Sequence, residues 1–362
     1  MKAKLILEDG TIYYGSSFGA DIEGRGEVVF NTSMTGYQEI LTDPSYRGQI
    51  VCMTYPLIGN YGVNGDDSES DRIQVEGFVV REASRIASNH RSEGELRAYL
   101  IRHGIAGIEG IDTRALTRRL RVKGSLRGII STTRDGDEEL IRRALAIPDM
   151  QGRNLADEVT CDRTNIWNET GILHIVVIDC GVKLNILREL AERDCRVTVV
   201  PSTVSMDEIR DLKPDGILIS NGPGDPEPVS NVISIAGECM GNIPLFGICL
   251  GHQILGIALG GRTYKLTFGH HGGNHPVKDL RTGSIAITVQ NHNFCVDTDS
   301  LDRDAVEITH INLNDNTVEG IRHRRLPVFS VQFHPEARPG PNDSKHLFDE
   351  FVSMVKKHAE EN

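Results

Sequence analysis

The sequence predicts an α/β protein of two domains: a smaller mixed α/β domain, then a larger one built on an open, mostly parallel sheet flanked by helices. The chain has 362 residues, about twice the length of an ordinary domain. From residue 173 onward, short apolar stretches alternate with amphipathic ones, which is typical of buried parallel strands and their covering helices. The first 150 residues carry strand-like and helical stretches without this alternation.

In the first half, Asp9-Gly10 between two apolar stretches predicts a hairpin, because glycine accepts the positive φ of a tight turn. Residues 74–80 are predicted as a strand, and helices are expected at 93–103, 113–122 and 138–146. Residues 151–170 are polar and without periodicity, so we expect a linker there. The predicted division is therefore 1–150, a linker at 151–170, and 171–362.

In the second half, strands and helices are predicted in alternation, which favours right-handed crossovers and a parallel sheet. The expected strands are 175–178, 196–200, 216–220 and 244–248, and the expected helices are 184–192, 206–212, 232–240 and 250–259. After Gly261 the chain becomes β-rich, with strands expected at 285–289, 306–311 and 328–333 and a closing helix at 344–357.

Composition argues against nucleic-acid and anionic-membrane binding. Lys and Arg number 39 and Asp and Glu 51, which gives a net charge of −12, whereas such binders need a basic face. No apolar stretch approaches the roughly 20 residues of a membrane span. Glu8 and Asp9 interrupt the start before a signal-peptide core develops. We expect neither nucleic acid nor membrane as a partner.

The seven cysteines are an odd number, are widely spaced and include no Cys-x-x-Cys pair. This usage fits free thiols in a reducing cytoplasm better than a disulfide or zinc framework. We therefore expect a cytoplasmic protein with no bound metal, in which a thiol is available for chemistry.

The strongest chemical signal is Gly-Ile-Cys-Leu-Gly-His-Gln at 247–253, between a predicted strand and a predicted helix. The glycines two residues before and two residues after Cys249 permit the sharp turn of a nucleophile elbow. The helix N-terminus that follows would stabilise a thiolate and offer backbone donors to an oxyanion. The alternative is a buried structural cysteine in a glycine-rich turn.

A second candidate is the His-Pro-Glu segment at 334–336. In extended chain, residues i and i+2 face the same side, so His334 and Glu336 can lie together as a base and the carboxylate that orients it. Pro335 restricts the backbone between them. Taken alone, the segment is more typical of two solvated side chains at a strand end, and the cysteine elbow on the same α/β unit is what favours the catalytic interpretation.

Three further segments have weaker signals. Asn-Gly-Pro-Gly-Asp-Pro at 221–226 follows a predicted parallel strand, where open sheets bind ligands; it is either an oxyanion or substrate-carboxylate loop or a plain turn, and it lacks the lysine of a phosphate loop. The three histidines of 269–276 are expected in a structured loop rather than at a metal site. The basic run 322–325 is expected to be a solvated turn.

In their order and over residues 171–360, these motifs resemble those of class I, or triad, glutamine amidotransferases. The resemblance implies that Cys249 attacks the side-chain amide of glutamine, that His334 is first base and then acid, and that Glu336 orients it. It also implies that Gly222, Gly224, Leu250 and Gln253 line the glutamine site.

Three stretches of the first half, 31–46, 54–62 and 110–117, resemble the amino-terminal domain of carbamoyl-phosphate synthase small subunits. Residues 269–276 and 290–294 match the same family. The resemblance adds Ser45, Asn291, Asn293 and Phe294 to the residues that contact glutamine. The family often has glycine at the position of Asn293, and asparagine is the non-glycine residue that best tolerates positive φ.

The resemblance implies a glutamine-hydrolysing subunit that forms a glutamyl thioester and passes ammonia to a large ATP-dependent subunit, which makes carbamoyl phosphate for pyrimidine or arginine synthesis. ATP and Mg²⁺ are expected on that partner, with no cofactor in this chain, and the first domain is expected to dock the partner. Two alternatives remain: a subunit of another synthase, such as anthranilate or aminodeoxychorismate synthase, and a regulatory pseudo-enzyme.

Overall fold

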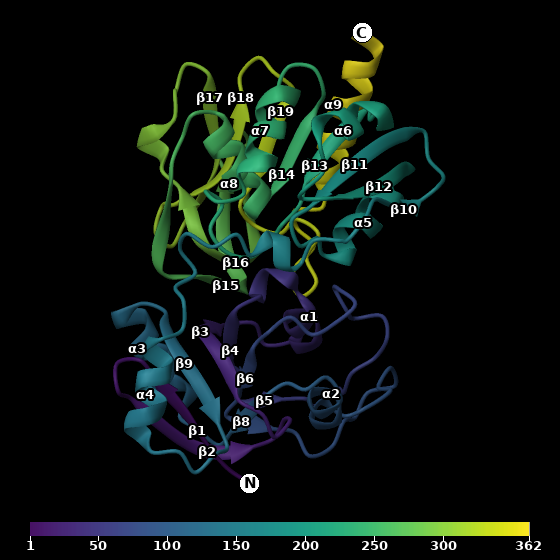
Figure 1. The fold of residues 1–362 in the computed structure, drawn as a ribbon. Coiled ribbons are helices and arrows are strands. Elements are labelled where there is room, and N and C mark those ends of the chain that lie inside the picture. The colour runs from purple at the N-terminus through teal and green to yellow at the C-terminus, as the bar shows by residue number, and fades with distance from the viewer. Residues whose placement is uncertain (362) are drawn as a thin grey trace. The chain divides into compact units, whose positions relative to one another are not determined.

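The computed structural model describes residues 1–361, and the chain folds into two compact units (Figure 1). Unit 1 comprises Met1–Met150 with Thr267–Gly272, and unit 2 comprises Gln151–Leu266 with the described chain from Gly273 onward. Among the described residues, no helix is long and apolar enough to cross a membrane.

Unit 1 is built on a closed barrel whose strands follow the order β1-β2-β8-β6-β4-β3-β9. The barrel strands are β1 (Lys2–Leu7), β2 (Ile12–Ser17), β3 (Gly24–Asn31), β4 (Gln49–Met53), β6 (Gly77–Val79), β8 (Gly107–Glu109) and β9 (Leu126–Ser131). Around it lie α1 (Tyr37–Thr42), α2 (Leu96–Arg102), α3 (Thr113–Lys123), α4 (Asp137–Leu145), the 3₁₀ turn η1 (Pro44–Tyr46) and a small sheet of β5 (Leu57–Ile58) and β7 (Glu82–Ala83). The mixed α/β character expected of this half is confirmed, whereas closure into a barrel was not predicted.

Local signals account for two of these elements. The β1–β2 hairpin turns at Gly10, whose φ is 84°, as the Asp-Gly pair predicts. Helix α3 begins after Asp112, whose side chain accepts a hydrogen bond from the Ala115 amide at 2.9 Å, and it ends at Gly124 with φ 94°. The predicted helix at 113–122 is therefore confirmed to within one residue.

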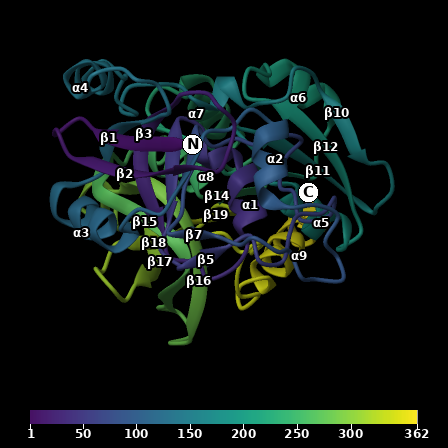
Figure 2. The same ribbon diagram turned by 90° about the horizontal axis from the view of Figure 1, so that it is seen from below.

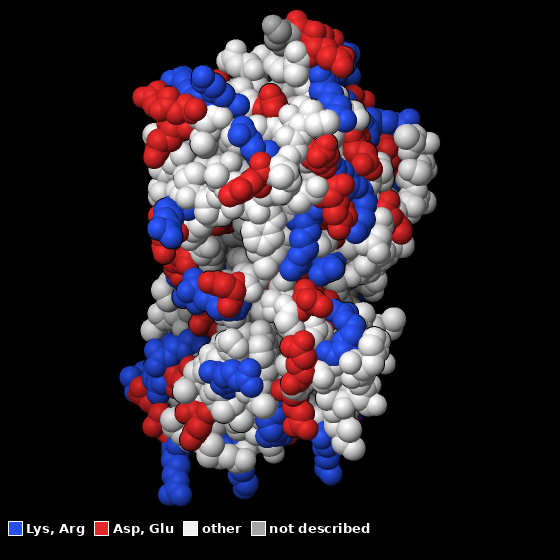
Figure 3. Space-filling view, turned by 90° about the vertical axis from the view of Figure 1, so that its right-hand side faces the viewer, with Lys and Arg blue, Asp and Glu red and all other residues white. Residues whose placement is uncertain are grey.

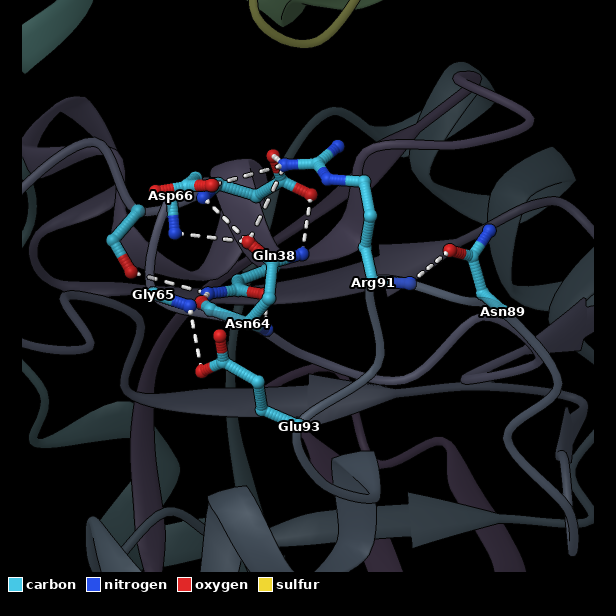
Figure 4. Close-up of polar contacts among 9 residues, drawn as sticks. Gln38, Asn64, Gly65, Asp66, Asn89, Arg91 and Glu93 are labelled. Carbon is cyan, nitrogen blue, oxygen red and sulfur yellow. Dashed lines mark hydrogen bonds and ion pairs between the residues drawn. The ribbon is translucent and has the colours of Figure 1, made fainter.

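Side-chain hydrogen bonds order the long loops of unit 1 (Figure 4). Asn64 Oδ1 accepts from the backbone amides of Asp66 and Asp67 at 2.9 and 3.0 Å, which folds the chain into a tight turn. Arg91, from a loop distant in sequence, donates to Asp67 at 2.7 Å, and Gln38 Nε2 donates to the Asn64 carbonyl. These contacts explain how two irregular segments hold one conformation without a sheet or helix.

Unit 2 is a three-layer α/β/α structure around a ten-stranded sheet of order β10-β12-β11-β13-β14-β19-β18-β17-β15-β16. The strands are β10 (Asn165–Asn168), β11 (Leu173–Asp179), β12 (Cys195–Pro201), β13 (Gly216–Ile219), β14 (Leu245–Ile248), β15 (Thr263–Asp279), β16 (Ile285–Val296), β17 (Val306–Asn312), β18 (Val318–His323) and β19 (Val328–Val331). Strands β12, β11, β13, β14 and β19 are parallel, and β18 and β17 continue the sheet in antiparallel fashion.

Helices cover both faces of this sheet because its central strands are apolar on both sides. Ile175 and Val177 of β11 pack with the helices α5 (Leu184–Ala191) and α9 (His346–Glu361) on one face. Val176 and Ile178 pack on the other, with α6 (Met206–Leu212), α7 (Ser230–Cys239) and α8 (Leu250–Ala258). Figure 2 shows α9 and α7 on opposite sides of β14 and β19. The predicted fold class is confirmed.

The structure corrects three local expectations. Residues 151–170, expected to be a linker, belong to unit 2: Leu155 is fully buried, and β10 is an edge strand paired with β12. Polar composition concealed this strand because an edge strand exposes most of its side chains. Residues 269–276, expected in a loop, lie within the long strand β15. In the basic run, Arg322 and His323 finish β18, and the turn begins only after them.

Candidate active site

Cys249 lies at the sharp turn between β14 and α8. Its backbone has φ 54° and ψ −103°, a conformation that non-glycine residues adopt rarely and at a cost of about 1–3 kcal/mol. Its amide donates to the Val331 carbonyl of the neighbouring strand at 2.9 Å, which helps to hold the turn. The thiol is almost completely buried, with Sγ 3.5 Å from the carbonyl oxygen of Asn291. The predicted elbow geometry is therefore present.

The elbow requires glycine at position 251, because a Cβ there would overlap the backbone carbonyl of Ile219. We expect Gly251→Ala to lower the free energy of unfolding by about 3 kcal/mol or more, measured by urea denaturation. Gly237→Ala in α7 is the matched control, since a Cβ there meets no heavy atom within 4 Å. That change should stabilise the protein by about 0.5–1 kcal/mol. Equal effects of the two substitutions would contradict the proposed close packing at the elbow.

His334 and Glu336 emerge at the same edge of the sheet as Cys249, because β19 runs parallel to β14 with Ile248 opposite Val331. The His334 Nδ1 atom lies 2.7 Å from Glu336 Oε1, and both side chains are buried. The structure thus brings the two side chains together as the i, i+2 spacing predicts. Nε2, on the far side of the ring, makes no well-formed hydrogen bond within the described chain.

The electrostatics of this pair favour its charged form. Burial by itself lowers the pKa of His334, but the Glu336 carboxylate and the Cys249 thiol outweigh burial and raise that pKa well above its usual range. Burial likewise raises the pKa of Glu336, but the charges of Lys183 and His334 prevail and hold it well below its usual range. An imidazole poised in this way holds a proton readily while Glu336 stays ionised.

Sequence reasoning missed Lys183, which lies at the start of α5 and is almost wholly buried. Its Nζ lies 2.9 Å from Glu336 Oε1 and donates to the Ala337 carbonyl at 2.6 Å. Its backbone amide donates to Asn221 Oδ1 at 3.0 Å. The only local signal was its place just beyond a strand of the parallel sheet, since nothing in the sequence near Lys183 reveals that the side chain is buried.

The loop 221–226 follows β13, as predicted, and lies against the start of α8. A Cβ at Gly222 would overlap the carbonyl of Cys180 and crowd the Leu250 side chain, so only glycine allows the backbone to approach α8 this closely. Gly224 has φ 85° and packs on Leu155. The loop therefore lies close to the start of α8 in a conformation that depends on these two glycines.

The other predicted glutamine-site residues of unit 2 are buried near the elbow. Gln253 Nε2 donates to the Phe294 carbonyl at 2.8 Å and thereby ties α8 to β16, the strand that carries Asn291 and Asn293. Asn293 lies in this strand without a positive φ, so the conformational argument made for it is unnecessary. Ser45 is in η1 of unit 1, where its amide donates to Asp43 at 2.9 Å, and its contact with glutamine stays a prediction.

Comparisons with known proteins agree with both halves of this description. A family model described as glutamine amidotransferase class-I matches residues 176–354, and one described as carbamoyl-phosphate synthase small chain, CPSase domain, matches residues 5–130. Carbamoyl phosphate synthase small chains are 55% identical in Aquifex aeolicus (98% of each chain covered), 51% in Solidesulfovibrio magneticus (99% of this chain, 100% of the relative) and 50% in Archaeoglobus fulgidus (99% and 100%).

Proposed function

The chain belongs to the carbamoyl phosphate synthase small chains, glutamine amidotransferase subunits that supply ammonia, and on this premise we propose that Cys249, His334 and Glu336 hydrolyse glutamine. The observation that supports these roles most directly is the convergence at one sheet edge of a thiol on a strained elbow and a buried His–Glu pair. Such an arrangement matches the requirement for a nucleophile, a base and a group that orients the base.

In the first half-reaction, His334 Nε2 takes the thiol proton and Sγ attacks the amide carbon of the glutamine side chain. The carbonyl π electrons move to oxygen and form a tetrahedral oxyanion. When the C–N bond breaks, His334 returns the proton to the leaving nitrogen, so that ammonia departs and a glutamyl thioester stays on Cys249. Glu336 holds the imidazole by Nδ1 throughout, which leaves Nε2 directed to the reacting atoms.

In the second half-reaction, a water gives a proton to His334 while its oxygen attacks the thioester. The C–S bond breaks, the sulfur recovers the proton, and glutamate leaves. For the oxyanion of both steps we propose the backbone amides of Leu250 and Gly222, which lie at the start of α8 and in the adjacent loop. The Gly251 amide is committed elsewhere, since it donates to the Ser220 carbonyl at 3.0 Å.

The partner that we propose is the large, ATP-dependent subunit of carbamoyl phosphate synthase, docked through unit 1 and holding the ATP and Mg²⁺. Ammonia released into water at neutral pH becomes ammonium, which is not a nucleophile, so direct transfer to the partner is favoured.

On the face drawn in Figure 3, acidic and basic side chains are interspersed, unlike a nucleic-acid-binding surface. All seven cysteines are free thiols, which supports a site of action in the cytoplasm.

A glutamine-like chloroketone tests the proposal, because it should alkylate Cys249 and free glutamine should slow that reaction. Peptide mass analysis would locate the adduct. Cys161 is the internal control for access: it is partly exposed, whereas the other six cysteines are buried, so labelling governed by access alone would reach Cys161 first. Chloroketone labelling of Cys161 ahead of Cys249, or labelling that glutamine does not slow, would contradict the proposal and favour a regulatory pseudo-enzyme.

A further inference from the structure

A chain of buried polar side chains links strands β16, β17 and β18 of unit 2. Asn312 Nδ2 donates to Glu319 Oε1, and Gln290 Nε2 donates to Glu319 Oε2, both at 2.9 Å. The Gln290 oxygen then lies 2.9 Å from His292 Nε2, and His292 Nδ1 lies 2.8 Å from the Phe294 carbonyl oxygen. All of these side chains are at most 5% exposed. The mechanism above uses none of the four side chains.

The orientation of the Gln290 amide follows from its other neighbour. The Thr288 hydroxyl donates to the His275 carbonyl at 2.9 Å, so its oxygen is left to accept from Gln290 Nε2 at 3.2 Å. The amide therefore presents nitrogen to Thr288 and Glu319 and presents oxygen to His292. If the amide were turned over, its oxygen would face the Glu319 carboxylate. Two acceptors would then lie opposite each other unless that carboxyl carried a proton.

With Glu319 as a carboxylate, the hydrogen bonds along this chain need one hydrogen more than a neutral His292 supplies. The Gln290 oxygen and the Phe294 carbonyl are both acceptors, so His292 must donate from both ring nitrogens. A neutral imidazole donates from only one. The network therefore holds one proton between Glu319 and His292: either a Glu319 carboxylate is paired with an imidazolium across Gln290, or a protonated Glu319 donates to a turned Gln290 that donates to a neutral His292.

This network includes the segment of β16 that lies beside Cys249. His292 follows Asn291, whose carbonyl oxygen is 3.5 Å from Cys249 Sγ. The Phe294 carbonyl that His292 contacts also accepts from Gln253 of α8, the helix that begins after Cys249. The position of His292 thus fixes the segment 291–294 against the elbow.

We propose that Glu319 is a positioning residue for glutamine binding, acting through Gln290 and His292 to hold the segment 291–294 beside Cys249. The inference rests on the proposed function, since it assigns this segment to the glutamine site. Glu319 itself does not touch the reacting atoms in this scheme; its role is to keep the proton-sharing chain intact.

Two substitutions at this position separate the proposal from general destabilisation. Glu319→Ala removes the acceptor of two buried amides, and we expect the KM for glutamine to rise by about tenfold or more while kcat changes by less than about threefold. Glu319→Gln supplies the missing hydrogen itself: the new amide can donate to a turned Gln290, which then donates to a neutral His292. We expect Glu319→Gln to retain KM within about threefold.

The measurement is glutamate release by the complete synthase, with thermal unfolding recorded alongside. Glu189→Ala is the matched control, because Glu189 is equally buried in unit 2 but pairs with Arg193 and Lys345. It should lose stability without a change in KM. If Glu319→Ala does not fold, Gln290→Ala breaks the same chain and should raise KM likewise.

The proposal is overturned if the foldable variants of Glu319 and Gln290 leave KM at the Glu189→Ala value, or if Glu319→Gln is as impaired as Glu319→Ala. Either result leaves the proposed function standing so long as the unmodified enzyme releases glutamate. Absence of glutamate release from the unmodified enzyme would instead refute the proposed function.

Discussion

Cys249→Ala should abolish glutamine-dependent carbamoyl phosphate synthesis and leave synthesis from free ammonia unchanged in the assembled enzyme. The side chain that forms the thioester is lost, but nothing that the partner needs for its own chemistry is removed. The turn itself should persist, since alanine retains the backbone amide that donates to Val331. Losing a nucleophile typically lowers kcat by about 10³-fold or more. Paired assays with glutamine and with ammonium salts would measure both activities.

Cys239→Ala serves as the control for this result. Cys239 is fully buried in α7, so its loss leaves a comparable small cavity without touching the elbow. Both activities should survive it. Equal loss of both activities in Cys249→Ala would argue that the substitution disrupts the complex, and retained glutamine-dependent synthesis would remove Cys249 from the mechanism.

Lys183→Met should impair both folding and glutamine hydrolysis. Without the ammonium group, Glu336 keeps its buried position but loses its nearest positive charge, and breaking a buried ion pair at one partner costs about 3–5 kcal/mol. The carboxylate would then hold His334 less firmly. We expect the free energy of unfolding to fall by about that amount, and kcat for glutamine to fall by roughly 10²-fold. Urea denaturation and glutamate release would measure the two effects.

The same substitution should change how the stability of the protein depends on pH, and the pKa of Glu336 fixes the direction of that change. Burial opposes ionisation of Glu336, but Lys183 and His334 lower its pKa to about 2, so the stability that it contributes is present above the ordinary value of 4.5 and is lost as pH falls toward 2. In Lys183→Met the pKa of Glu336 should rise, and acid unfolding should begin at higher pH. Lys345→Met is the control: this lysine is 35% exposed and pairs with Glu189, so its loss should cost about 1 kcal/mol or less. Equal effects would contradict the role assigned to Lys183.

The features that could be predicted from the sequence were those that depend on a few neighbouring residues. Helix α6 was predicted at its observed bounds, and the structure shows that Ser205 and Glu208 form a capping box at its start. The elbow and the His-Pro-Glu segment could be predicted because each motif consists of a few consecutive residues. Lys183, the edge strand β10 and the barrel closure depend on pairings between distant segments, which no short stretch of sequence encodes.

The family also excludes one alternative that the motifs left open, a subunit of another synthase. A subunit of anthranilate or aminodeoxychorismate synthase does not account for the first half, whereas the small-chain family model matches residues 5–130 and the three relatives named above match 98% or more of the chain. The amidotransferase motifs identify the chemistry, and the first half identifies the synthase that it serves.

The strand order of unit 2 has a consequence for how the protein is made. Strand β19 is the last strand in the chain, yet it lies in the interior of the sheet, between β14 and β18. Cys249 therefore leaves the ribosome long before the segment that carries His334, and the Cys249 amide can bond to Val331 only once β19 has inserted. A nascent or truncated chain that ends before β19 lacks His334 and Glu336, so under the proposed mechanism such a chain cannot release ammonia.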